Sequence, residues 1–232
     1  MRRREYPDND MKGKLIVIEG LDGSGKATQT QKLYETLKAD NRKVMKVSFP
    51  DYESNSSALV KMYLGGEFGT DPDSVNPYAA SSFYAVDRFA SYAKNWKEFY
   101  LSGGIVIADR YTTSNAIHQC AKLPQEKWKD FIEWLFSYEY ELLGIPVPCC
   151  TVYLRVDPKI SQELLNIRYN GSQDKKDIHE ADVGYLRRSR QAADFCAENL
   201  GWNTVECIRD GKLRSVEDIS CNINKLIESV IK

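Results

Sequence analysis

The sequence has no excess of charge of either sign. Its 232 residues include 32 Lys and Arg against 33 Asp and Glu, which gives a formal net charge of −1. A protein without an overall positive field has no general attraction to nucleic acid. The chain also lacks an apolar run of membrane-spanning length, and its first residues lack the apolar core of a signal peptide. We therefore expect no nucleic-acid partner, no membrane partner and a cytoplasmic location.

Metal-binding and disulfide spacings are also missing. The six cysteines do not form the close pairs typical of zinc sites, and there are only two histidines. Reduced cysteines in a protein core are the simplest interpretation. With 42% apolar and 28% charged residues, the composition is that of an ordinary globular protein. We predict a flexible leader over residues 1–11 and a single domain over residues 12–232.

A strand, a glycine loop and a helix follow one another near the start of the chain. Four apolar residues, Leu15 to Ile18, predict a buried strand, and residues 20–26 have the spacing G-x-x-x-x-G-K of a phosphate-binding loop. Glycines let the backbone approach a ligand closely, and a helix begins with unpaired N–H donors. We expect nine consecutive residues to contact the phosphates of a nucleoside triphosphate: Gly20, Leu21, Asp22, Gly23, Ser24, Gly25, Lys26, Ala27 and Thr28.

One position departs from this motif. The residue after the lysine is usually Ser or Thr, whose hydroxyl binds magnesium, but here it is Ala27. Thr28 follows, and successive helix residues point about 100° apart, so its hydroxyl does not simply replace the missing one. We expect Mg²⁺ to be held mainly by phosphate oxygens, water and a nearby carboxylate.

Apolar runs alternate with helical patterns along the rest of the chain, and long helices are predicted over residues 75–101 and 124–143. Further strands are predicted at residues 43–49, 105–108, 150–156 and 202–208, which gives a five-stranded parallel sheet with helices on both faces. The expected fold is a three-layer α/β fold like that of P-loop NTPases, with a small lid at about residues 168–180. Ligands bind outside the carboxyl ends of such strands. That rule brings together the loop at Gly20, the turn at Phe49-Pro50 and the pair Asp109-Arg110.

Several short segments together identify a family. The phosphate-binding loop, Phe49-Pro50, the run Tyr84 to Arg88, and Asp109-Arg110-Tyr111 followed by Ser114-Asn115 occur in the order and spacing of thymidylate kinases. The chain resembles that family from about Lys12 to its C-terminus. The resemblance implies transfer of the γ-phosphate of ATP to dTMP, with Mg²⁺ as cofactor and ATP and dTMP as ligands. It also implies a homodimer.

The resemblance also implies roles for individual residues. Lys26, Asp22, Arg110 and a lid cation at Arg168, Lys175 or Lys176 would be catalytic, and Asp109 would act near the magnesium. Arg88 and Arg110 would grip the acceptor phosphate. The other acceptor-binding residues implied are Phe49 and Tyr84 at the base, Asn115 as a hydrogen-bond partner of the base, Tyr52 near the phosphate, and His118 beside the sugar.

Simpler interpretations stay open for these residues. Arg88 could pair with a carboxylate on a helix face, Asp109 and Arg110 could form a structural ion pair, and Asn115 could cap a helix. Two other functions also stay open. One is phosphate transfer to another nucleoside monophosphate or to a nucleoside. The other is nucleotide binding without turnover, which Ala27 and Asn166, at a position where the family often has Arg, would favour.

Overall fold

A parallel β-sheet forms the centre of the molecule. The computed structural model describes residues 13–157, 160–161, 164 and 183–231. The sheet has five strands in the order β2-β3-β1-β4-β5, and every neighbouring pair is parallel. The strands are β1 (Lys14–Gly20), β2 (Val44–Ser48), β3 (Ile105–Asp109), β4 (Cys150–Arg155) and β5 (Asn203–Glu206). All five predicted strands are confirmed, and β1 continues through Glu19 to Gly20.

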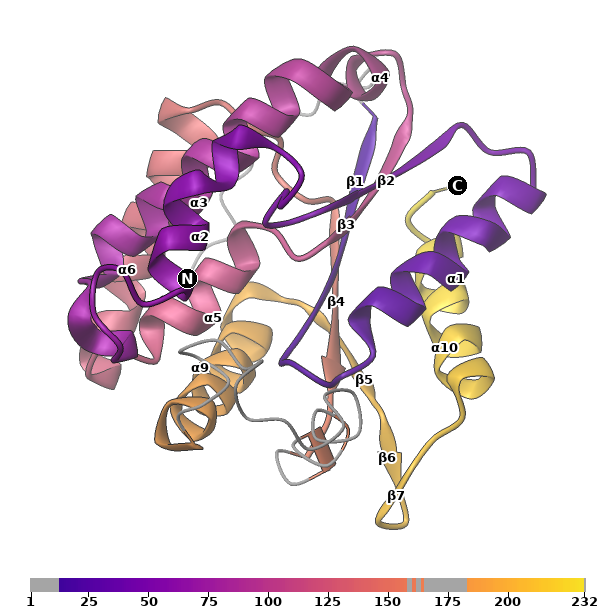
Figure 1. The fold of residues 1–232 in the computed structure, drawn as a ribbon. Coiled ribbons are helices and arrows are strands. Elements are labelled where there is room, and N and C mark those ends of the chain that lie inside the picture. The colour runs from indigo at the N-terminus through magenta and orange to yellow at the C-terminus, as the bar shows by residue number, and fades with distance from the viewer. Residues whose placement is uncertain (1–12, 158–159, 162–163, 165–182, 232) are drawn as a thin grey trace.

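Helices cover both faces of the sheet, as Figure 1 shows. One face carries α1 (Lys26–Ala39) and α10 (Val216–Glu228). Ile16 and Ile18 of β1 point toward these helices and pack in one cluster with Leu33 and Ile223. Leu15 and Val17 point to the opposite face. Because β1 is buried on both sides, its sequence is a continuous apolar run instead of an alternating one.

The opposite face carries most of the remaining helices. They are α2 (Ala58–Leu64), α3 (Pro77–Ser91), α4 (Lys97–Leu101), α5 (Thr112–Cys120), α6 (Trp128–Phe136) and α9 (Val183–Leu200). Tyr92 and Trp96 pack against Leu15 and Val17. A further apolar cluster joins α5, α6 and α9, and Phe131 lies at its centre, fully buried.

Two long helices predicted from the sequence are interrupted. The helix expected over residues 75–101 begins at Pro77, where Asn76 caps it, and contains a π-helical turn at Tyr92–Trp96. The helix expected over residues 124–143 begins with a 3₁₀ turn at Gln125–Lys127 and ends in a π-helical turn at Ser137–Leu142. π-helical turns insert one residue into a helix and occur often beside functional sites.

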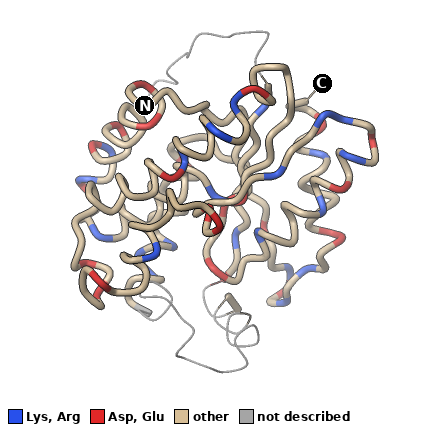
Figure 2. The backbone as a smooth tube through the Cα atoms, turned by 45° about the horizontal axis from the view of Figure 1, so that its top comes forward, with Lys and Arg blue, Asp and Glu red and all other residues tan. Residues whose placement is uncertain are grey.

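The charged residues and the cysteines show no special arrangement in the described part of the chain. Lys, Arg, Asp and Glu are scattered over the chain without separation of the two signs (Figure 2). No helix in the described part of the chain has the length and apolar character needed to cross a membrane. All six cysteines are free thiols, and four are buried as expected, but Cys149 and Cys221 are exposed.

Candidate active site

The phosphate-binding loop lies between β1 and α1. Gly23 and Gly25 adopt left-handed conformations, with φ of 78° and 85°, which glycine reaches without steric cost. No side chain caps the first turn of α1, so its N–H groups are available to an anion. Lys26 lies at that turn, nearly buried, and its Nζ donates a hydrogen bond to the Leu21 carbonyl at 2.9 Å. The segment therefore has the shape of an anion site.

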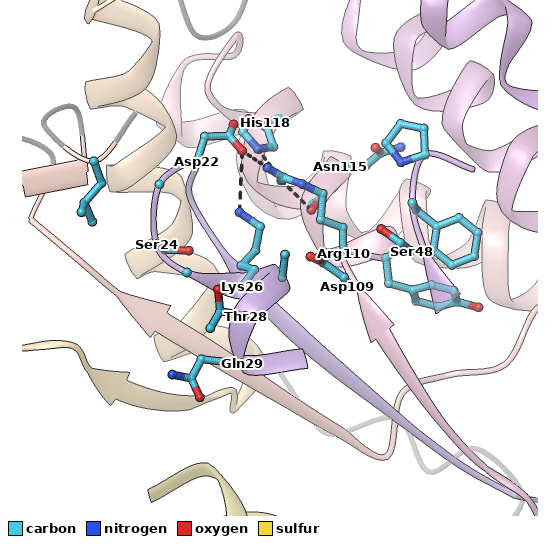
Figure 3. A pocket seen from close by; sticks show the side chains of 18 of the residues that line it. Asp22, Ser24, Lys26, Thr28, Gln29, Ser48, Asp109, Arg110, Asn115 and His118 are labelled. Carbon is cyan, nitrogen blue, oxygen red and sulfur yellow. Dashed lines mark hydrogen bonds and ion pairs between the residues drawn. The ribbon is translucent and has the colours of Figure 1, made fainter. Parts of the chain in front are cut away.

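Asp22 joins two cations at the centre of the site (Figure 3). Its carboxylate accepts a short hydrogen bond from Nη2 of Arg110 and lies 3.7 Å from Nζ of Lys26. Burial alone would raise the pKa of Asp22, but the cations Arg110 and Lys26 outweigh it and hold that pKa well below the usual range. Burial and the neighbouring Arg110 lower the pKa of Lys26, while Asp22 opposes this change. Asp22 therefore balances the charge of the two cations.

Arg110 is held in a strained and specific position. Its φ of 67° lies in the left-handed region, which costs free energy for a residue other than glycine. Its Nη1 lies 3.3 Å from Ser114 Oγ and 3.3 Å from His118 Nε2. Burial would lower the pKa of Arg110, but Asp22, Glu19 and Asp109 raise it, so the guanidinium stays charged. Strain of this kind is typical of residues whose direction matters for function.

Glu19 connects the phosphate-binding loop to α5. The carboxylate is completely buried, and it accepts hydrogen bonds from the Gly20 N–H at 2.9 Å and the Thr113 hydroxyl at 2.7 Å. The Ser114 hydroxyl donates to it as well, at 2.8 Å. Sequence reasoning treated Glu19 only as the end of a strand. An acidic residue directly after a buried apolar run was the available signal, because a buried carboxylate needs such partners.

A cavity of about 860 Å³ opens beside the loop and contains most of the predicted site. Every residue predicted for the acceptor lines it: Phe49, Tyr52, Tyr84, Arg88, Arg110, Asn115 and His118. Asp109 and residues 22–28 of the loop line it too, whereas Gly20 and Leu21 are not among the lining residues. The structure thus brings these residues together, and their individual roles stay predictions.

Arg88 lies in this wall as one half of a buried ion pair. Its Nε and Nη2 donate to the two carboxylate oxygens of Glu139 at 2.6 and 2.5 Å, and both side chains are almost completely buried. The Thr112 hydroxyl also donates to Glu139, at 2.8 Å. Burial would lower the pKa of Arg88, but Glu139 raises it overall. Glu139 therefore compensates the charge of Arg88, which matches the simpler interpretation of Arg88 as one half of an ion pair.

Asn115 and Asp87 have roles that the sequence did not show. Because α5 begins at Thr112, Asn115 lies inside the helix and does not cap it. Its side chain donates instead to the Ser81 carbonyl on α3, at 3.2 Å. Asp87 accepts hydrogen bonds from the Asp51 N–H at 2.8 Å and from Ser56 at 2.6 Å. It thereby fixes the segment after Phe49-Pro50, whose peptide bond is cis, against α3.

The cavity also extends toward α10, which sequence reasoning missed. The additional lining residues there are Gln29, Leu213, Arg214, Val216 and Ile219. Nε2 of Gln29 donates to the Val216 carbonyl at 3.0 Å and so connects α1 to the start of α10. Leu213 belongs to a short hairpin of β6 (Ile208–Arg209) and β7 (Lys212–Leu213). The strand predicted over residues 202–208 includes only Ile208 of this hairpin.

The described residues of the site offer few ligands to a metal ion. No group of three or more His, Cys, Asp or Glu residues among the described residues is arranged to hold a metal ion. Asp109 is one carboxylate at the end of β3 that faces the cavity, while Asp22 is engaged by Arg110. One carboxylate together with phosphate oxygens and water is a usual environment for Mg²⁺. The residues present therefore fit a magnesium ion that arrives with the nucleotide.

Some of the predicted features fall on segments outside the part of the chain that the structure describes. The lid at about residues 168–180 lies outside the described residues, and with it Arg168, Lys175 and Lys176. Asn166 and the leader over residues 1–11 lie outside them as well. The lid, its cation and the leader stay predictions.

Comparison with known proteins gives one consistent result. The family model described as thymidylate kinase matches residues 18–217. A thymidylate kinase of Mycobacterium tuberculosis is 31% identical over 190 residues, which cover 81% of this chain and 87% of that protein. One from Plasmodium falciparum is 26% identical over 96% of this chain and 93% of its own length. A solved thymidylate kinase from Candida albicans has a TM-score of 0.69 at 21% identity and covers 94% of this chain and 92% of its own. That structure supports the fold alone.

Proposed function

The chain belongs to the thymidylate kinase family, and from this premise we propose how its own residues transfer the γ-phosphate of ATP to dTMP. The observation that carries the proposal is the position of Lys26 and Arg110 on two sides of Asp22. Phosphoryl transfer depends mainly on positioning and on neutralising phosphate charge. A buried lysine and a partly buried arginine from different elements, facing one cavity, supply both.

The donor binds at the loop. The N–H groups of residues 23–27 and the first turn of α1 hold the β- and γ-phosphates, and Lys26 adds a positive charge beside them. The part of the cavity lined by Gln29, Leu213 and Val216 then receives the nucleoside of ATP. Asp109 supplies a carboxylate to the magnesium, which neutralises phosphate charge when it is bound.

The acceptor binds on the opposite side of the loop. Arg110 takes the phosphate of dTMP, because a guanidinium binds two phosphate oxygens side by side. Phe49 and Tyr84 contact the base, and Asn115 lies beside them in the wall. Arg88 was predicted to grip the acceptor phosphate as well. Since Glu139 compensates its charge, we assign Arg88 the part of a fixed hydrogen-bond donor in this wall, and leave the phosphate to Arg110.

A panel of acceptors tests this assignment. ADP release is measured with ATP and Mg²⁺ against dTMP, dUMP, UMP, dCMP, dGMP and AMP. We expect the highest kcat/KM with dTMP, because the acceptor side is shaped by aromatic rings and one amide. Faster turnover of another monophosphate would assign the chain a different acceptor. ATP binding without turnover of any acceptor would favour a binding module.

We also propose that the protein is a homodimer that associates through the outer face of α3. Tyr78, Val86 and Phe89 on that helix are 45, 48 and 43% exposed. Their spacing places them on one side of the helix, and an exposed apolar stripe of this kind is typical of an interface. Sedimentation velocity of the purified protein is expected to give the mass of two chains. A monomer at micromolar concentration would contradict the proposal.

Two further predictions from the sequence are kept as proposals. They are a cytoplasmic location and a single domain over residues 12–232.

A further inference from the structure

His118 and Tyr185 form a hydrogen-bonded pair behind Arg110. His118 is on α5 and Tyr185 on α9, both are buried, and their rings are nearly parallel with centroids 6.1 Å apart. Nδ1 of His118 lies 3.3 Å from the Tyr185 hydroxyl, which also lies 3.0 Å from the His118 carbonyl oxygen. Nε2 of His118 lies 3.3 Å from Nη1 of Arg110. These contacts connect α9 to the proposed phosphate-binding arginine.

The hydrogen-bond directions in this group follow from the chemistry of its members. A guanidinium only donates, so Nε2 of His118 must accept, and the imidazole must be neutral. The proton of the ring is then on Nδ1 and is donated to the Tyr185 oxygen. The Tyr185 hydroxyl in turn donates to the His118 carbonyl. Of the ring's tautomers, the neutral Nδ1–H form is the one that satisfies these three contacts together.

We propose that Tyr185 and His118 are positioning residues for Arg110: Tyr185 holds His118 in the neutral Nδ1–H tautomer, and the Nε2 lone pair of His118 directs the guanidinium toward the acceptor phosphate. The inference rests on the proposed function of Arg110. Arg110 needs such support because its backbone is strained and because, among the described residues, its guanidinium otherwise hydrogen-bonds to Asp22 and Ser114. Protonation of His118 removes the acceptor and places a second positive charge against Arg110.

Among the described residues, the charged and titratable groups with recorded contacts around His118 and Tyr185 come from three elements. Arg110 follows β3, Tyr185 comes from α9, and Asp22 of the loop interacts with His118 electrostatically. Arg188 lies over the outer part of the Tyr185 ring, 5.9 Å from its centroid. Of these described groups, Arg110 and Arg188 are cations and would repel a positive charge on His118, whereas Asp22 would attract it.

Three variants of the full chain test the proposal through the kinetics with dTMP. Tyr185→Phe keeps the ring and removes the hydroxyl, and we expect KM for dTMP to rise about five-fold, as for the loss of one hydrogen bond, with a smaller change in kcat. Tyr100→Phe is the control, because Tyr100 is a buried tyrosine near Gly13, at the amino end of β1 and away from the site. His118→Leu is expected to raise KM for dTMP at every pH. In His118→Gln the amide oxygen accepts the hydrogen bond without titrating, so KM for dTMP should return to near the wild-type value.

The pH dependence separates positioning from simple packing. Imidazoles titrate in the mildly acidic range, so kcat/KM for dTMP is expected to fall more steeply from about pH 8 to about pH 6 in the wild type than in His118→Gln. Ionisation of dTMP itself affects both proteins equally. Equal pH profiles, or an unchanged KM in Tyr185→Phe, would overturn the proposal.

A readout without turnover distinguishes this inference from the proposed function. The chain has two histidines, His118 and His179, so the ¹⁵N resonances of His118 are those lost in His118→Gln. We expect the Nδ1–H pattern in the wild type and a mixture of tautomers in Tyr185→Phe. The same mixture in both proteins would refute the role of Tyr185. Absence of dTMP turnover in the wild type would instead refute the proposed function.

Discussion

Replacing Lys26 with Ala is expected to lower kcat with dTMP by about 100- to 1,000-fold, the usual effect of removing one preorganised group that stabilises transition-state charge. Lys26 lies at the first turn of α1, where the loop amides and the helix dipole already favour an anion. Its ammonium group is nearly buried and lies beside Asp22. In such surroundings the attraction between a cation and the transferring phosphate is screened little by water.

The control for this experiment is Lys46→Ala. Lys46 is an exposed residue of β2 whose ammonium group donates to Gln31 Oε1 at 2.5 Å, so its loss should leave kcat unchanged. ATP affinity is measured by calorimetry on the same variants. A Lys26→Ala protein with full turnover would show that the loop does not act on the phosphates. A wild type that binds ATP without turnover, and loses only this binding in the variant, would indicate a nucleotide sensor.

Replacing Glu139 with Ala should lower the free energy of unfolding by about 3–5 kcal/mol, because it leaves Arg88 buried without its partner. Arg88 makes a bidentate contact with Glu139, with hydrogen bonds of 2.6 and 2.5 Å, and the two side chains have almost no exposure to water. Thr112 would also lose its acceptor. Urea unfolding followed by circular dichroism measures the change.

Glu141 offers a matched control in the same π-helical turn. It is exposed and accepts a hydrogen bond from the nearby Ser137 hydroxyl at 2.7 Å. Since a carboxylate at the surface is solvated whether or not it is paired, Glu141→Ala should change stability by less than about 0.5 kcal/mol. The double replacement Arg88→Met with Glu139→Leu removes both charges and should recover most of the stability. Equal stability of Glu139→Ala and Glu141→Ala would show that the buried pair contributes nothing.

The strands were predictable because each is short, apolar and followed by a turn signal. Helix α5 was not, because its sequence from Thr112 to Cys120 consists largely of residues with low helix propensity. Packing against α3, α6 and α9 stabilises it instead. The π-helical turn around Glu139 was equally hidden, since one inserted residue leaves little trace in an apolar pattern.

The residues of the site also differ in whether the sequence could predict them. Lys26 could be named from the spacing of its motif, and Arg88, Arg110 and His118 from the resemblance to a family. The partners that hold Arg88 and His118 could not be named, because Glu139 and Tyr185 are 51 and 67 residues distant from these side chains. A contact between residues so far apart depends on how helices pack, and one sequence without relatives does not record it. The region beside α10 was missed for the same reason.

The buried carboxylate of Glu19 has a consequence for motion. Gly20 at the root of the phosphate-binding loop and Thr113 and Ser114 on α5 all depend on that one group. If either side opened alone, the carboxylate would lose partners in a place that water does not reach. The phosphate-binding loop and the start of α5 therefore unfold locally only as one unit. We expect the Gly20 amide to exchange with deuterium only when this whole unit unfolds.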